Sequence, residues 1–226
     1  MMKILLLVLA ALMASFAEAA EGDPGSARGV SLPAPPAAGA MSLEEALARR
    51  RSVREFASGA LTLAEASRLA WAAQGVTEPE RRTAPSAGAT YPLEVYLVAG
   101  DVENLAAGVY RYLPGLHRLE TVADGDIRLP LAAAAVGQQW VSRAALVVVI
   151  AAVFERTTAR YGKRGERYVH MEAGHAAQNL LLQATALGLG ATPVGAFNDA
   201  EVARLLHLPA GATPLYIIPV GRRPQS

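Results

Sequence analysis

Hydrophobic positions between residues 168 and 187 recur at steps of three and four residues, as they do on the buried face of a helix. Much of this face is alanine, which allows a partner helix or a flat ligand to approach closely. Gly188 and Gly190 are expected to end the helix, and a short strand is expected to begin over 191–194. The stretch predicts one long core helix with the inward residues Val169, Ala173, Ala176, Ala177, Leu180, Leu181, Ala184 and Leu187.

Other stretches predict shorter elements around this helix. Capping-box spacings, a Ser or Thr followed three residues later by Glu, open two helices, and Leu43 and Leu47 are expected on the inner side of the first. Residues 108–122 have the pattern of a β-hairpin, so we expect an α+β layered fold rather than a purely parallel sheet. The predicted helices span 42–50, 62–74 and 199–206, and the predicted strands lie within 93–98, 108–122, 145–154 and 213–221.

The N-terminus has the pattern of a secretory signal peptide. Lys3 precedes a hydrophobic run that is too short to span a bilayer comfortably, and Ala17-Glu18-Ala19 fits a small-x-small cleavage site. Residues 1–19 are therefore predicted to be a signal peptide, with an uncleaved anchor or a misassigned start codon as the alternatives. Residues 20–40, rich in Ala, Pro and Gly, predict a flexible lead-in to a folded domain over 41–226.

Composition narrows the classes of function. The formal net charge is +1, so no strong electrostatic field indicates nucleic acid or anionic lipid as a partner. The chain has no cysteine, which removes disulfides, thiolate nucleophiles, cysteine-ligated metals and a lipoprotein anchor. Together with the signal pattern at the N-terminus, this composition predicts export to the bacterial periplasm, with no stable membrane anchor once the signal has been cleaved.

Two segments are candidate binding elements. The segment 49–56 places four arginines and Ser52 after a helix end, which suits either a solvated surface or the binding of a phosphate. The loop 82–92 consists largely of small residues before a strand, so that a planar ligand can lie against its backbone.

The polar residues of the long helix do not have the spacing of a metal site. His170 and His175 lie five positions apart with Glu172 between them, which places the two imidazoles on different helix faces. His175 and Asn179, one turn apart, are instead expected to hydrogen-bond loop backbone.

The chain resembles the nitroreductase family, and within it the SagB-type, thiazole- or oxazole-forming dehydrogenase branch, in four segments taken in order: RRSVREF, PSAGATYPLEVYLV, EAGHAAQNLLLQATALGLGATPVGAF and IIPVGR. The resemblance extends from about residue 42 to 223. It implies a nitroreductase-like three-layer fold with a central mixed sheet flanked by helices. It also implies a homodimer that binds FMN at its interface and acts as an FMN-dependent oxidoreductase on a small molecule or a peptide.

The resemblance further implies which residues hold the cofactor. The arginine-rich segment and the C-terminal segment would bind the FMN phosphate, and the small-residue loop would lie along the flavin of the other subunit. The stretch after the long helix would bring a backbone amide to flavin N5. The implied residues are Arg50, Arg51, Ser52, Arg54, Ser86, Ala87, Gly88, Val194, Gly195, Ala196, Arg222 and Arg223.

The chemistry implied by the resemblance belongs to the flavin, which the protein binds and orients. Azoline-oxidising relatives carry Lys-Tyr where this chain has Arg160-Tyr161, and an arginine stays protonated and cannot act as a base. Arg160 and Tyr161 are the catalytic candidates, and the insert 124–165 supplies the pocket candidates Gln138, Gln139 and Trp140.

Three other readings stay open beside an oxidoreductase of an unidentified small molecule. The first is a flavin-binding protein without turnover, the second an azoline-oxidising dehydrogenase of peptide modification, and the third a cofactor-free interaction protein that keeps the dimeric shell.

Overall fold

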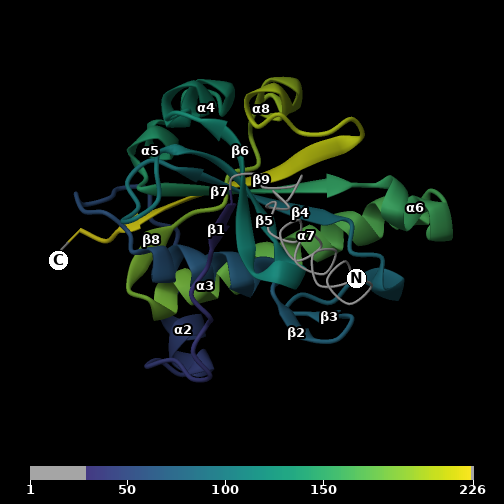
Figure 1. Ribbon diagram of the computed structural model, residues 1–226, viewed down its shortest axis with the longest axis horizontal. Coiled ribbons are helices and arrows are strands. Elements are labelled where there is room, and N and C mark those ends of the chain that lie inside the picture. Colours follow the sequence, from purple (N-terminus) through teal and green to yellow (C-terminus); the bar gives the residue numbers. More distant parts are fainter. Residues whose placement is uncertain (1–28, 225–226) are drawn as a thin grey trace, which may run out of the picture.

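A computed structural model describes residues 29–224 of the chain. The predicted signal peptide and residues 20–28 of the lead-in lie outside the described residues. Figure 1 shows a central sheet with helices on both sides. Its strands are β1 (Gly29–Ser31), β4 (Leu93–Ala99), β5 (Gly108–Leu113), β6 (Arg118–Asp124), β7 (Leu146–Val153), β8 (Leu189–Ala191) and β9 (Ala212–Arg222). A separate small hairpin comprises β2 (Val76–Glu78) and β3 (Arg81–Arg82).

The helices are α2 (Leu43–Arg49), α3 (Leu63–Gln74), α4 (Arg128–Ala134), α5 (Gln139–Arg143), α6 (Glu155–Tyr161), α7 (Arg164–Ala186) and α8 (Asp199–Leu205), with short 3-10 helices η1 (Ala87–Ala89) and η2 (Pro114–Leu116). The three-layer α+β fold is therefore confirmed. Within the described residues, no helix is both long and hydrophobic enough to cross a membrane.

The sheet has the strand order β1-β6-β5-β4-β7-β9-β8, and each neighbouring pair of these strands is antiparallel. The mixed character predicted for it is thus confined to isolated parallel bridges, Ser52 with Ala191 and Leu61 with Val102. β5 and β6 pair as a hairpin, a connection that antiparallel strands allow, whereas a parallel pair needs a long crossover.

The side chains of β4 and β7 alternate between two hydrophobic cores. Leu97 and Val148 face the core shared with α3 and α7, while Val98 and Val147 face the core shared with α4, α5 and α8. Figure 1 shows these two sets of helices on opposite sides of the sheet. The continuous hydrophobic run of β7 is explained by this burial on both faces.

The long helix α7 is the centre of one layer, as its hydrophobic repeat predicts. It begins at Arg164, four residues before the stretch that shows the repeat, and ends at Ala186. Gly188 follows with a φ of +71°, a left-handed conformation that glycine adopts without strain.

The prediction for α2 was wrong in one respect. Leu43 and Leu47 are 60% and 53% exposed, and Ala46 is the residue that α2 buries.

The lead-in is shorter than predicted. Residues 29–31 form β1, which pairs with β6, and the next residue, Leu32, is buried and donates its amide to the His117 carbonyl at 3.2 Å. Pro33 accepts a hydrogen bond from the Ser67 hydroxyl at 2.6 Å. Val30 and Leu32 alternate with polar or small neighbours, and so this end of the lead-in adds an edge strand to the sheet.

Candidate functional site: two groups of residues at opposite ends of the sheet

The arginine-rich segment lies along the ends of β8 and β9. Val53 donates its amide to the Ala191 carbonyl at 3.0 Å, next to the bridge between Ser52 and Ala191. Ala57 donates its amide to the Arg222 carbonyl at 3.0 Å. Backbone pairing therefore joins the segment after α2 to the C-terminal strand, which lies more than a hundred residues away in the sequence.

Two glycines make this pairing possible. A Cβ on Gly190 would lie 2.6 Å from Val53 Cγ1, and a Cβ on Gly221 would lie 2.8 Å from Phe56 Cγ. Both separations are far inside van der Waals contact. Gly221 thus has a packing role against Phe56.

The arginines of this segment have different partners. Arg51 donates to the Ala48 and Arg50 carbonyls at the end of α2, at 2.7 and 2.8 Å. The Arg54 guanidinium lies 5.7 Å from the centre of the Trp140 ring and makes no hydrogen bond or ion pair within residues 29–224. Arg54 and Ser52 are exposed, so that both are available to a ligand.

The terminal arginines are held by the protein itself. Arg222 donates to both carboxylate oxygens of Glu65, at 2.6 and 2.8 Å, and also to the Ala60 carbonyl. Glu65 in turn caps α3 through Thr62. Arg222 is therefore held in place by the protein itself, and its contact with the phosphate stays a prediction. Arg223 donates its Nε to the Leu189 carbonyl at 3.2 Å.

The stretch after α7 turns back to the same end of the sheet. Val194 exchanges two backbone hydrogen bonds with Ile217 of β9, and the Gln138 side chain donates to the Ala196 carbonyl at 3.0 Å. Gly195 is exposed, and a Cβ built on it has no atom within 4 Å. Gln138 thus joins the pocket candidates of the insert to the predicted flavin loop. Gln139, by contrast, pairs with Arg143 at 2.8 Å.

Two buried polar atoms near this stretch lack a partner within the described residues. They are the Trp140 indole Nε1 and the Thr192 hydroxyl, which directly precedes the 193–196 loop. Such atoms are costly to bury without a hydrogen bond. We call residues 50–54, 194–196, Trp140 and Arg223 the arginine half-site.

The other candidates gather in a second group. Residues 86–91 form a tight turn around η1, and the Arg160 guanidinium donates to the Gly88 carbonyl at 3.1 Å. A Cβ on Gly88 would lie 2.5 Å from the Tyr161 hydroxyl. The two catalytic candidates thus lie directly on the predicted flavin loop. We call Ser86, Ala87, Gly88, Arg160 and Tyr161 the turn half-site.

The two half-sites belong to opposite ends of the molecule. Figure 1 shows α5, β8 and the C-terminus at one end of the sheet and α6, which carries Arg160 and Tyr161, at the other. One chain therefore presents two separate halves of the predicted cofactor site.

Of the two α7 residues predicted to hydrogen-bond loop backbone, His175 and Asn179, only Asn179 makes such a contact among the described residues. Asn179 donates to the Thr83 carbonyl at 3.1 Å, which confirms its expected contact with loop backbone. His175 is exposed, and the His170 ring packs edge-on to Phe154. The residue that the sequence analysis missed is Glu172, which is only 3% exposed. Its place among the inward positions of α7 was the available signal, since a carboxylate on a buried face needs an explanation.

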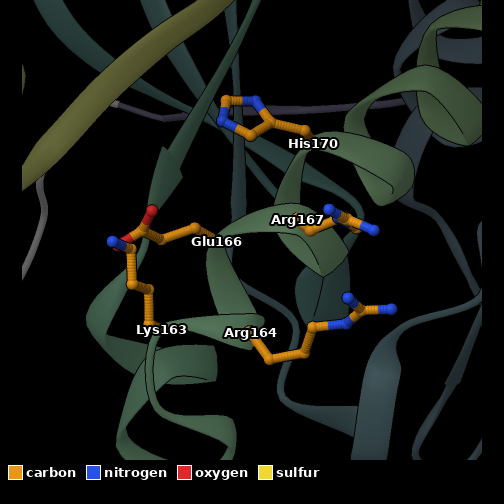
Figure 2. Close-up of a pocket in the computed structure, with 5 residues that line it drawn as sticks. All are labelled: Lys163, Arg164, Glu166, Arg167 and His170. Atoms are coloured by element: carbon orange, nitrogen blue, oxygen red, sulfur yellow. The ribbon is translucent and has the colours of Figure 1, made fainter.

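The start of α7 carries an open cavity of about 540 Å³ (Figure 2). It is lined by Lys163, Arg164, Glu166, Arg167 and His170. Because this cavity contains no residue of either half-site, it does not complete the predicted cofactor site.

Comparison with known proteins identifies the fold's family. The family model "Nitroreductase family" matches residues 47–222, most of the described chain. MJ1384 of Methanocaldococcus jannaschii, whose nitroreductase name is a prediction, is 49% identical over 184 residues, which are 81% of this chain and 92% of that protein. A crystal structure from Ralstonia eutropha JMP134, also named a nitroreductase by prediction, superposes with a TM-score of 0.78 at 32% identity and covers 89% of this chain and 93% of that one.

A third relative is named as a microcin-processing protein. The microcin B17-processing protein McbC of Escherichia coli is 34% identical over 133 residues, and the match covers 57% of this chain and about half, 49%, of McbC. The structure of the E. coli McbBCD complex with truncated pro-MccB17 bound contains a chain that superposes with a TM-score of 0.67 at 26% identity, covering 96% of this chain and 82% of that one. With its fold, its segment order and these matches, the chain belongs to the nitroreductase family of oxidoreductases.

Proposed function

We propose that this protein is an FMN-dependent oxidoreductase whose cofactor site is shared between two copies of the chain. One observation carries the proposal: the residues of the predicted site form two half-sites, at opposite ends of one sheet. A C₂ dimer brings one half of each copy to the other half of its partner, so that two complete sites result.

The arginine half-site has the donors that a phosphorylated ligand needs. Arg54 and Ser52 are exposed, and Arg54 makes no ion pair with another described residue. Guanidinium groups bind phosphate oxygens through charge-assisted hydrogen bonds. Within residues 29–224 the buried Trp140 Nε1 has no hydrogen-bond partner, and Gly195 borders open space; both features favour a ligand close to this surface. These features fit FMN, with Arg50, Arg51, Ser52, Arg54 and Arg223 as the proposed phosphate and ribityl residues.

The chain's own contribution is binding and orientation. When bound, FMN supplies the hydride chemistry. The Gln138 hydrogen bond to Ala196 fixes the loop at which the reactive edge of the ring is expected to lie. Exposed Gly195 leaves room for a ring beside the backbone, and the turn half-site of the partner covers the remaining face.

The proposal is tested by the visible spectrum of the purified protein and by titration with FMN. Flavin absorbance that stays with the protein, and that bleaches anaerobically with a reductant such as NADH or NADPH, supports it. Arg54→Ala should raise the Kd for FMN by about tenfold or more, since a charge-assisted contact contributes about 1.5–3 kcal/mol. Arg49→Ala is the matched control, because Arg49 is exposed and pairs with Glu45. A protein that binds no FMN would contradict the proposal, and one that binds FMN but resists all reductants would favour a flavin-binding protein without turnover.

A second candidate function is azoline oxidation in a peptide, as the likeness to McbC suggests. The observation in its favour is the place of the Tyr161 hydroxyl against Gly88 of the turn half-site. Arg160 is engaged with the Gly88 carbonyl, and a guanidinium group does not act as a base in proteins, so Tyr161 is the acid–base candidate that remains. Mass spectrometry of an azoline-containing peptide after incubation with the enzyme distinguishes the two functions, with Tyr161→Phe as the variant that should lose this activity.

We also propose that the mature protein acts in the periplasm after removal of residues 1–19. The basis is the signal pattern at the N-terminus. Fractionation of the native host together with N-terminal sequencing of the purified protein tests this. An intact Met1 in a cytosolic fraction would overturn it.

A further inference from the structure

The turn that carries Ser86, Ala87 and Gly88 has a strained backbone. Besides Gly88, Ala89 and Tyr91 have positive φ angles, +53° and +45°. For residues with a Cβ this conformation is unfavourable, and it persists only where neighbouring groups hold it. The shape of the turn therefore depends on its contacts.

Most of these contacts come from α6 and from the turn itself. The Thr90 hydroxyl lies 2.8 Å from the hydroxyl of Thr157, which is buried on α6. Arg160 binds the Gly88 carbonyl, as described above. Within the turn, the Tyr91 amide donates to Ser86 Oγ at 2.9 Å. Ser86 Oγ accepts this bond, so its own proton is available to an acceptor.

The carboxyl group of Glu172 on α7 interacts with this hydroxyl and is the acceptor that we assign to it below. The Glu172 side chain is 3% exposed, interacts with the Ser86 hydroxyl, and has one oxygen, Oε1, without a hydrogen-bond partner within residues 29–224. Burial raises the pKa of Glu172 to about 7, although the Ser86 hydroxyl and the Arg82 guanidinium oppose the shift. A carboxyl group buried at this cost and facing one loop indicates a specific role.

We propose that Glu172 is the positioning residue of the turn half-site, holding Ser86 through its hydroxyl and so fixing the conformation in which residues 86–88 meet the flavin. This rests on the proposed function. Glu172 does not touch the ligand itself but acts through Ser86, which also orders the Tyr91 amide. In this way a side chain of α7 fixes the conformation of the turn, while Thr157 and Arg160 of α6 hold it through further contacts.

The charged groups around Glu172 give the direction of its pH dependence. Arg82 is the cation that faces it, and Arg82 is bound to Gln74 and stacked on Tyr91, with Glu94 and Arg156 further out. An ionised carboxylate accepts a stronger hydrogen bond than a neutral carboxyl group does. The turn is therefore expected to be better ordered when Glu172 is ionised, above about pH 7, even though ionisation of this buried group lowers the stability of the fold as a whole.

The experiment uses the full-length chain in three variants: Glu172→Ala, the isosteric Glu172→Gln, and the control Glu166→Gln. Glu166 lies on the same helix, exposed at the open cavity in Figure 2. Hydrogen exchange of the peptide that covers residues 84–92 is measured without flavin, between about pH 6 and 8. The Kd for FMN is measured over the same range through quenching of flavin fluorescence.

We expect Glu172→Ala to increase exchange in this peptide and to raise the Kd for FMN, each by about tenfold or more, with other peptides unchanged. Glu172→Gln should keep most of the affinity but lose the pH dependence, and Glu166→Gln should match the wild type. An FMN Kd within about twofold of wild type in Glu172→Ala overturns the proposal. Equally increased exchange throughout the protein also overturns it. If Glu172→Ala does not fold, the Glu172→Gln variant decides, and a pH dependence equal to that of the wild type overturns the proposal. If the wild type binds no FMN, the proposed function fails, but the exchange measurement still decides whether Glu172 positions the turn.

Discussion

At the scale of single residues, Glu172 makes stability depend on pH in an unusual direction. Its pKa is raised by burial from 4.5 to about 7, so the folded chain holds this proton more tightly than the unfolded chain does. Its contribution to the free energy of unfolding is therefore full at low pH and is lost as pH rises from about 4.5 through 7, with a slope of at most about 1.4 kcal/mol per unit. Urea unfolding of wild type and Glu172→Gln across this range should show that slope as their difference. Parallel curves for the two proteins would contradict the prediction.

The Arg222–Glu65 pair makes the opposite prediction. Burial alone would raise the pKa of Glu65, but hydrogen bonds from Arg222 and from the Thr62 backbone hold it below its ordinary value. The pair therefore stabilises the fold above the ordinary pKa and is lost as pH falls through the lowered one. Arg222→Ala should lower the free energy of unfolding by about 1–3 kcal/mol near neutral pH, because it leaves a part-buried carboxylate without its partner.

A matched control separates this pair from an ordinary surface pair. Arg204 and Glu201 are joined on the exposed side of α8, so Arg204→Ala should change stability little. Equal effects of Arg204→Ala and Arg222→Ala in urea unfolding would show that Arg222 has no structural role beyond that of a surface cation.

At the scale of elements, the arginine half-site depends on how closely the 52–56 segment packs onto β8 and β9. Gly190→Ala would place a methyl group 2.6 Å from Val53 Cγ1, and a β-branched side chain has little freedom to move away. We expect a loss of about 1–3 kcal/mol in stability together with weaker FMN binding. Adding Val53→Ala should restore much of both, as thermal unfolding and FMN titration would show. Failure of Val53→Ala to restore stability in the Gly190→Ala variant would contradict the packing explanation.

Gly174→Ala on α7, where the new Cβ has no neighbour within 4 Å, should instead stabilise the protein by up to about 1 kcal/mol.

Elements with strong local signals were predictable, and elements that depend on distant contacts were not. The Thr62–Glu65 capping box predicted the start of α3, because its hydrogen bonds are made within the first turn. β1 has only three residues and exists because β6 pairs with it. α4 and α5 were missed because neither has a side-chain cap and both are short. The exposed leucines of α2 show the same limit, since periodicity does not indicate which neighbour a short helix meets.

At the scale of the whole molecule, the sequence order of the site segments predicted their family but not their arrangement. The pairing of Val53 with Ala191 and of Ala57 with Arg222 brings the arginine segment to the C-terminal strand, as one predicted site requires. The structural commitment of Arg222 to Glu65 could not be predicted, because the two residues lie far apart in the chain and either could have met a ligand. The separation of the turn half-site, by contrast, agrees with its expected contribution to another subunit.

A dimer with shared sites can be tested by complementation, which does not require the substrate. Arg54→Ala impairs the arginine half-site, and Gly88→Ala impairs the turn half-site, because the residue has a φ of +61° and a new Cβ would lie 2.5 Å from the Tyr161 hydroxyl. Each variant alone should bind FMN weakly. After the two are mixed and their subunits exchange, half of the dimers combine both variants, and each of these has one site with two intact halves. FMN binding at wild-type affinity should therefore return to about a quarter of the sites. If mass spectrometry shows mixed dimers and no such sites appear, each chain builds its site alone, and the two half-sites do not form one site across an interface.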